Sequence, residues 1–188
     1  LTINPVTATT TYTVTGTAAN TCTNTATGTI TMNPRPTVTA SSFTVCENGS
    51  ATITAGGANT YVWNTGISTA GLTVNPVTAT TTYTVTGTDV NGCQNTATAT
   101  VTVNSLPNTP TVIATAYSYC KDAIATPLLA NASFNHTLVW YNSDGVSVLT
   151  APFTPPTSTT GTFTYYVSQI DNSTGCESPT ESSDVIVG

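Results

Sequence analysis

Residues 72–88 read LTVNPVTATTTYTVTGT and residues 1–17 read LTINPVTATTTYTVTGT, so one stretch returns almost letter for letter about 71 residues later. The match continues past this stretch, because Cys22 falls on Cys93. A repeat of this length, with its own strands and turns, is one folded module copied along a chain. The sequence therefore predicts a tandem array, and we expect it to open in the middle of a module.

The repeat alternates in the way that a half-buried β-strand does. In residues 82–88 and 96–103, Thr alternates with mostly apolar residues, and successive side chains of a strand point to opposite faces. Residues 51–55 and 60–63 add two shorter strands, with Trp63 facing inward. The inward face of the two longer strands is predicted to hold Tyr83, Val85, Ala97, Ala99, Val101 and Val103.

Turn signals separate these strands. Asn91-Gly92 is a strong signal for a tight hairpin, and the run Asn142–Gly145 is another. Trp140 takes the place of Trp63 in the later module. Short strands, a turn about every 8 to 12 residues and no helical periodicity predict an all-β chain of tandem immunoglobulin-like antiparallel β-sandwiches.

The repeat also sets the predicted domain boundaries. Residues 1–34 are expected to be the C-terminal part of a truncated module, and residues 35–105 and 106–188 to be two complete modules. The linkers between them are short and contain proline, which favours extended, semi-rigid spacers. We therefore expect an elongated array.

Composition excludes several classes of partner. Arg35 and Lys121 are the only basic residues, the net charge is −6, and about a quarter of the residues are Thr. Neutralising phosphates takes a patch of Lys and Arg, so the sequence argues against nucleic-acid binding. It also contains no run of about 18 apolar residues, so we expect no membrane insertion in this segment.

The cysteines indicate an oxidising environment. Each complete module has two, which suggests the disulfides Cys46 with Cys93 and Cys120 with Cys176, while Cys22 is left over in the truncated module. The alternative is that these are recurring buried free thiols. Disulfides form outside the cytosol, so the pattern predicts an extracellular, cell-surface location.

The truncated module leaves an apolar face without a partner sheet. Its strands between Thr9 and Met32 carry Tyr12, Val14, Ile30 and Met32 on one side. Exposed apolar surface costs about 25 cal/mol per Å². We expect neighbouring repeats of the same protein, or another subunit that donates strands, to complete residues 1–34.

Nothing in the sequence predicts catalysis. His136 is the only histidine, and no Ser, Cys or carboxylate forms a recognisable motif with it, which is typical of a surface-loop residue. No metal-ligand spacing occurs, and turn chemistry already explains the Asp and Asn residues at hairpin tips that could hold a weak Ca²⁺. The sequence thus predicts no enzyme activity, no cofactor and no metal.

Three stretches carry a resemblance to a known family. They are TVCENGSATITA at 44–55, TTTYTVTGTDVNGC at 80–93 and TYYVSQIDNSTGCES at 164–178. The chain resembles the immunoglobulin-like repeats of very large surface proteins of Bacteroidota, which include gliding-motility adhesins and other cargo of type IX secretion. The resemblance implies a non-catalytic segment of a secreted cell-surface adhesin or filament, in which the modules act as a rigid spacer. The alternative is a glycan-binding accessory module of a secreted enzyme.

One pair of residues is a candidate binding patch. Trp140 and Tyr165 align with inward residues of the preceding module, so Tyr141 and Tyr166 should point outward from adjacent strands. Two exposed tyrosines would form an aromatic platform for a surface polysaccharide or a protein ligand. The alternative is a cross-strand pair that only stabilises its sheet.

Overall fold

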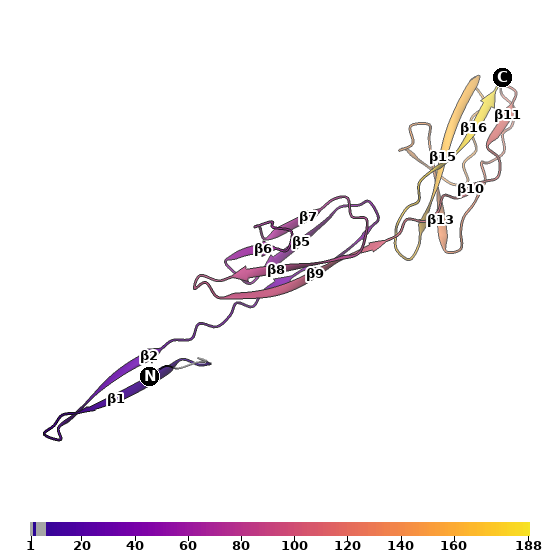
Figure 1. Ribbon diagram of the computed structural model, residues 1–188. Helices are drawn as coiled ribbons and strands as arrows, with labels where there is room; N and C mark the ends of the chain where they lie inside the picture. Colours follow the sequence, from indigo (N-terminus) through magenta and orange to yellow (C-terminus); the bar gives the residue numbers. More distant parts are fainter. Residues whose placement is uncertain (1, 3–6) are drawn as a thin grey trace. The chain divides into compact units, whose positions relative to one another are not determined.

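The computed structural model describes residue 2 and residues 7–188. Within that part of the chain every regular element is a β-strand, as Figure 1 shows, so the predicted all-β fold class is confirmed. Residues 1 and 3–6, which begin the sequence repeat and the first predicted module, lie outside the described residues.

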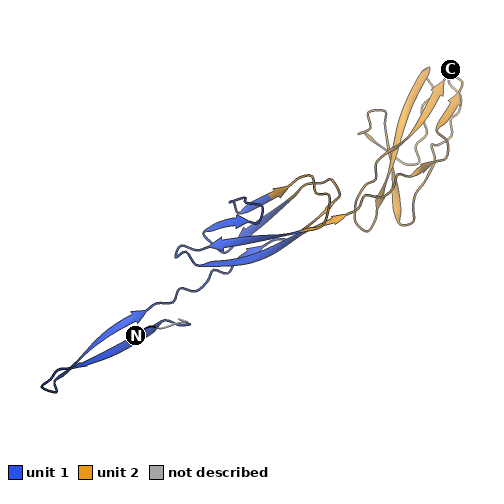
Figure 2. Ribbon diagram, viewed as in Figure 1, with its two compact units in different colours: residues 1–42, 52–72, 82–100 blue, residues 43–51, 73–81, 101–188 orange. Residues whose placement is uncertain are grey.

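The chain divides into two compact units, which are coloured separately in Figure 2. Unit 1 contains residues 1–42, 52–72 and 82–100. Unit 2 contains residues 43–51, 73–81 and 101–188.

Unit 1 begins with a hairpin. β1 (Thr10–Thr17) pairs antiparallel with β2 (Thr23–Ile30), and all eight residues of each strand are in register. Among the described residues these two strands form a sheet of their own. Alternation along β1 places Tyr12 and Val14 on one face, and Val14 is 66% exposed. The predicted apolar face is therefore open in this structure.

The next strands form a three-stranded sheet of order β3-β5-β7 and a four-stranded sheet of order β4-β9-β8-β6. Their bounds are β3 (Thr39–Ala40), β4 (Phe43–Cys46), β5 (Ala51–Gly56), β6 (Thr60–Trp63), β7 (Gly71–Val74), β8 (Thr81–Thr88) and β9 (Gln94–Asn104). The buried apolar side chains of unit 1 come from both sheets: Ile53, Trp63, Leu72, Val85 and Ala99. The indole nitrogen of Trp63 donates to the carbonyl oxygen of Thr69 at 3.0 Å, so its polar atom is satisfied inside the core.

Unit 2 contains a second sandwich. A five-stranded sheet of order β11-β16-β15-β13-β14 faces a small sheet of β10 and β12. The bounds are β10 (Thr111–Val112), β11 (Ala116–Tyr119), β12 (Ala130–Asn131), β13 (His136–Tyr141), β14 (Val148–Leu149), β15 (Gly161–Asp171) and β16 (Glu181–Val187). The core between them consists of Leu128, Trp140, Tyr165, Val167, Val185 and Val187.

The alternation in sequence predicts the strand faces well. Val85, Ala99 and Val101 are fully buried, and the other residues of the predicted inward face are partly buried: Tyr83, Ala97 and Val103. Alternate residues lie on one face because successive side chains of a strand point to opposite sides. The predicted hairpins also form, because the amide of Gly92 bonds to the carbonyl of Asp89 at 3.2 Å.

The disulfide pattern differs from the prediction. Cys46 and Cys176, both in unit 2, are bonded to each other, with their Cα atoms 5.6 Å apart and a sequence separation of 130. Cys22, Cys93 and Cys120 are free thiols. The predicted pairs Cys46–Cys93 and Cys120–Cys176 are therefore wrong.

Strand geometry explains why the two cysteines of one module do not pair. Cys120 follows Tyr119, which lies opposite Val187 at the end of β16, whereas Cys176 lies in the turn before β16 begins. A strand rises about 3.3 Å per residue, so the seven residues of β16 hold these two positions about 20 Å apart. A disulfide needs Cα atoms within about 7 Å. In the preceding module, Cys46 and Cys93 are likewise tied to opposite ends of β9.

Candidate functional site

The tyrosine pair predicted from the sequence lies on adjacent strands. In the register between β13 and β15, Tyr141 is directly opposite Tyr166 (Figure 1 shows the two strands). The preceding residue on each strand, Trp140 and Tyr165, is buried in the core at 3% and 4% exposure. Tyr141 and Tyr166 therefore project from the other face of the sheet, and both are only partly buried.

A carboxylate lies beside these rings. The hydroxyl of Tyr141 donates a hydrogen bond to Oε1 of Glu177, and the buried hydroxyl of Ser168 donates to the same oxygen. Ser168 is two residues from Tyr166 along β15 and so lies on the same face. The outer face thus combines two aromatic rings with a charged acceptor group that is exposed to solvent.

The segment after β15 positions Glu177 by folding back on the strand. Glu177 forms an isolated antiparallel bridge with Ile170. Ser178 extends this contact, because its amide donates to the carbonyl of Gln169 at 2.9 Å and its hydroxyl accepts from the Gln169 amide at 3.0 Å. The residue before Glu177 is the fully buried, disulfide-bonded Cys176. The position of Glu177 is therefore fixed by its two neighbours, the disulfide-bonded Cys176 and the hydrogen-bonded Ser178.

The surroundings keep the phenol of Tyr141 protonated. Burial raises the pKa of Tyr141 above its ordinary value of 10.0, and the hydrogen bond to Glu177 and the negative charge of that carboxylate raise the pKa further. The contact with Ser168 lowers the pKa and opposes part of this effect. At neutral pH the Tyr141 hydroxyl thus stays protonated and donates a hydrogen bond, which Oε1 of Glu177 accepts.

The hairpin after β13 lies beside the ring of Tyr166. The amide of Asn142 bonds to the carbonyl of Ser147 at 2.9 Å, and the amide of Gly145 bonds to the carbonyl of Asn142 at 2.8 Å, so the hairpin predicted at Asn142–Gly145 forms. A Cβ added at Gly145 would lie 4.0 Å from Cδ2 of Tyr166. Hydrogen bonds from Ser147 hold the pKa of the Asp144 carboxyl below its ordinary value.

The preceding module has the equivalent strand pair, β6 with β8, but no tyrosines at the two outer positions. It carries Asn64 and Thr84 where the later module carries Tyr141 and Tyr166. The amide of Thr84 donates to Oδ1 of Asn64 at 3.2 Å. The alignment is fixed by the core pairs one residue away, which are Trp63 with Val85 and Trp140 with Val167. The two modules therefore form a natural comparison.

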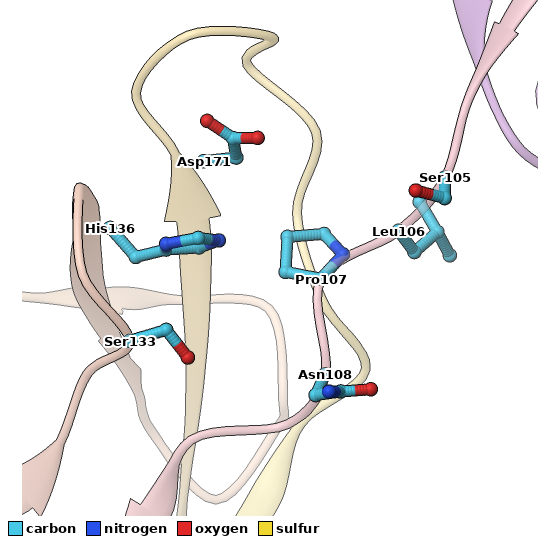
Figure 3. Close-up of a pocket in the computed structure, with 7 residues that line it drawn as sticks. All are labelled: Ser105, Leu106, Pro107, Asn108, Ser133, His136 and Asp171. Carbon is cyan, nitrogen blue, oxygen red and sulfur yellow. The ribbon is translucent and has the colours of Figure 1, made fainter.

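A polar cavity of about 420 Å³ lies where the linker meets the later module (Figure 3). It is lined by Ser105, Leu106, Pro107, Asn108, Ser133, His136 and Asp171. Nδ1 of His136 lies 2.7 Å from the carbonyl oxygen of Phe134, and hydrogen bonds from Ser173 lower the pKa of Asp171. Nδ1 of His136 and Oδ1 of Asp171 thus already have hydrogen-bond partners.

The prediction that His136 lies in a surface loop is wrong. His136 is the first residue of β13, and it is half-buried.

The described part of the chain offers little other site chemistry. No group of three or more His, Cys, Asp and Glu residues in it could hold a metal ion. Nor does it contain a helix long and apolar enough to cross a membrane. The sequence predicted that Tyr141 and Tyr166 lie on adjacent strands, and their role in binding stays a prediction. It gave no role to Ser168 or Glu177, although Glu177 lies in the Cys-Glu-Ser run that carried the family resemblance.

Comparisons with known proteins give a family match for residues 107–188 and several similar solved structures. No curated protein matches the chain. Among solved structures, the fibronectin(III)-like modules of Clostridium thermocellum CbhA are 12% identical, with a TM-score of 0.42, over 80% of this chain and 93% of that one. The Ig1-2 module of the Drosophila receptor protein tyrosine phosphatase DLAR is 13% identical, with a TM-score of 0.33, over 82% of this chain and 100% of that one. Residues 107–188 match the family described as "Ig-like domain CHU_C associated", so this part of the chain is similar to a family of immunoglobulin-like domains.

Proposed function

We propose that this chain is a non-catalytic segment of a large secreted cell-surface adhesin or filament. Its immunoglobulin-like modules act as a rigid spacer, and the module at residues 106–188 also binds a ligand. The family match of residues 107–188 supports a structural or binding role. The observation that carries the binding role is the pairing of Tyr141 with Tyr166 on an outer sheet face beside Glu177.

Two features support the spacer role and the extracellular location. The Cys46–Cys176 disulfide needs an oxidising environment to form and persist. The linker is also held by a side chain, because Nε2 of the fully buried Gln169 donates to the carbonyl oxygen of Asn108 at 2.7 Å. A linker fixed in this way resists bending at the start of the module.

The chemistry of the tyrosine face favours a neutral polysaccharide. Aromatic rings provide flat apolar surfaces with polar edges against which sugar rings pack. Glu177 is a carboxylate acceptor for sugar hydroxyls. The chain carries a net charge of −6 and only two basic residues, so it repels anionic polymers. A protein ligand with exposed hydroxyls or amides is the second candidate, because paired tyrosines also anchor protein interfaces.

The resemblance to gliding-motility adhesins and type IX secretion cargo suggests a setting for this segment. A glycan-binding accessory module of a secreted enzyme would use the same tyrosine face. The sequence of the parent protein separates these cases. A long array of similar modules supports the adhesin, whereas an adjacent hydrolase domain supports the accessory module.

Binding is tested with the whole chain on an array of immobilised neutral polysaccharides and in a cell-adhesion assay. The double variant Tyr141→Ala with Tyr166→Ala should bind at least tenfold more weakly, a change of about 1.4 kcal/mol. The matched control is Asn64→Ala with Thr84→Ala in the preceding module, which should leave binding unchanged. Equal binding by the wild type and the tyrosine variant contradicts the proposal.

A further inference from the structure

Three cysteines close hairpins of one kind. In each hairpin the amide of the residue that opens the turn donates to the carbonyl of the cysteine: Ala18 to Cys22 at 2.8 Å, Asp89 to Cys93 at 3.0 Å and Asp171 to Cys176 at 3.0 Å. In each hairpin the residue directly before the cysteine has a positive φ: Thr21, Gly92 and Gly175. Cys22, Cys93 and Cys176 are therefore structural equivalents, and we call them hairpin cysteines.

Cys46 and Cys120 share a different turn. Cys46 is the last residue of β4, which runs parallel to β9, and Cys120 directly follows β11, which runs parallel to β16. In each case the partner is the last strand of the module. Two residues after each cysteine, Asn48 and Asp122 adopt left-handed φ values of 64° and 61°. We call Cys46 and Cys120 turn cysteines.

The hydrogen bonds of the two turns match as well. The residue after each cysteine donates its amide to a carbonyl at the end of the neighbouring parallel strand. Glu47 donates to Asn104, the last residue of β9, at 2.8 Å, and Lys121 donates to Gly188, the residue after β16, at 2.9 Å. The residue three positions after each cysteine bonds back to that cysteine: Gly49 to Cys46 at 3.0 Å and Ala123 to Cys120 at 3.1 Å. The same backbone turn therefore places both cysteines beside the end of the last strand of their module.

The disulfide in this structure joins one cysteine of each kind. Cys46 is the turn cysteine of one module, and Cys176 is the hairpin cysteine of the next. The hairpin cysteine is placed for a partner on its N-terminal side, because the thiol of Cys93 lies 3.8 Å from the carbonyl oxygen of Asn33 in the linker before its module. The bond is thus a feature of the joint between consecutive modules.

We propose that Cys120 is one half of a second joint of this type, and that its partner is the hairpin cysteine of a further immunoglobulin-like module of the same kind. Two independent observations support the assignment. Cys120 is an exposed free thiol in the same turn as Cys46, and Cys46 is bonded to a hairpin cysteine in this structure. Such a joint forms whether or not the tyrosine face binds a ligand.

Bond formation needs an oxidant, for which a small-molecule disulfide such as oxidised glutathione suffices. The Cys120 thiolate attacks one sulfur of oxidised glutathione, and one glutathione leaves as a thiolate. The hairpin thiolate then attacks the Cys120 sulfur of this mixed disulfide and displaces the second glutathione. The two protein thiols lose two protons and two electrons, and one oxidised glutathione becomes two reduced molecules.

The test uses the whole chain extended after Gly188 by a second module. One extension repeats residues 105–188 with its copy of Cys120 changed to Ser, so that its one cysteine is a counterpart of Cys176. The other repeats residues 33–104 with its copy of Cys46 changed to Ser, so that its one cysteine is a counterpart of Cys93. Both are refolded with a mixture of reduced and oxidised glutathione and mapped by peptide mass spectrometry without reduction. We expect the Cys46–Cys176 bridge in every chain. We also expect a bridge from Cys120 to the appended hairpin cysteine, with alkylation of Cys120 falling at least tenfold against the unextended chain.

The matched control replaces only the appended hairpin cysteine by Ser, and it should restore alkylation of Cys120 while the Cys46–Cys176 bridge persists. Two extensions are compared so that poor folding of one appended module does not decide the result. A Cys120 bridge to the appended module in either extension supports the proposal. Alkylation of Cys120 in both extended chains, or a bond from Cys120 to Cys176 of its own module, overturns it.

Discussion

Val14 and Val85 occupy the same position of an identical sequence, yet Val14 is 66% exposed and Val85 is fully buried. Residues 7–17 and 78–88 agree letter for letter, and both stretches form an antiparallel pair with the strand that follows. The difference is the facing sheet of order β3-β5-β7, because β5 and β7 place the buried side chains of Ile53 and Leu72 in the core of the module that contains Val85. Tertiary packing, not local sequence, sets the burial of this residue.

The different burial of Val14 and Val85 predicts that the same Val→Ala substitution affects stability differently at the two positions. Val85→Ala should lower the free energy of unfolding by about 2 kcal/mol, because it removes two buried methyl groups and leaves a cavity. Val14→Ala should change it by less than about 0.5 kcal/mol, because that side chain is in water. Urea denaturation followed by Trp63 fluorescence in a Trp140→Phe background measures both. Equal effects would contradict the assignment of these faces.

Thiol counting tests the observed disulfide. Without reduction, alkylation of the denatured wild type should label three cysteines, Cys22, Cys93 and Cys120. The variant Cys176→Ser should label four, because Cys46 joins them. Intact mass spectrometry reads the count directly. Labelling of Cys46 in the unreduced wild type, or a bridged peptide that contains Cys93, would show that the pairing is different.

The phenol of Tyr141 should titrate differently when Glu177 loses its charge. Glu177→Gln removes the negative charge and its strong acceptor, so the pKa of Tyr141 should fall toward 10.0, although burial still holds it above that value. Ultraviolet titration of tyrosinate, with Tyr141→Phe subtracted as the reference, isolates this group. An unchanged titration curve in Glu177→Gln would mean that the carboxylate does not contact the ring in solution.

The raised pKa of Tyr141 also makes the stability of the fold depend on pH. The folded chain holds the phenolic proton more tightly than the unfolded chain, whose pKa is near 10.0. The stability from this protonated group is therefore fully present below pH 10 and is lost as the pH rises through the raised pKa. Tyr141→Phe should flatten the decline in stability above pH 10, measured by urea denaturation across that range.

Gln169 should be sensitive to substitution because it is fully buried and hydrogen-bonded on both ends of its amide. Oε1 accepts from the amide of Ser133 at 2.7 Å, and Nε2 donates to the carbonyl of Asn108. Gln169→Leu leaves both backbone groups without these partners, and we expect a loss of about 3 kcal/mol in the free energy of unfolding. The exposed Gln94→Leu is the control, with a change below about 0.5 kcal/mol. Similar stability of the two variants would refute the role of Gln169.

The local pattern of this sequence predicts most of the sandwich. Thr alternating with apolar residues sets the faces of β8 and β9, and Trp63 marks the core. Gly92 is placed where a hairpin needs a positive φ, which glycine adopts without steric cost. The outward pairing of Tyr141 with Tyr166 follows from the same alternation, because it needs only the strand register of one sheet.

Long-range features escaped prediction for physical reasons. Counting two cysteines per module does not distinguish a bond within a module from a bond between modules, since both leave the same number of thiols. The choice depends on which end of a strand each cysteine occupies, and Cys120 and Cys176 lie at opposite ends of β16. The contact of Glu177 with Tyr141 depends on the fold of the loop after β15, and alternation carries no information about that loop.

The Cys46–Cys176 bond also sets the route that a pulling force takes through the chain. Tension that enters before Cys46 crosses the sulfur bridge to Cys176 and leaves along β16, so the 130-residue span between the cysteines is not stretched while the bond is intact. That span could otherwise extend to about 450 Å. Modules joined in this way unravel only at their margins, so a stalk built from them would keep its length under shear even if the sandwich cores were weak.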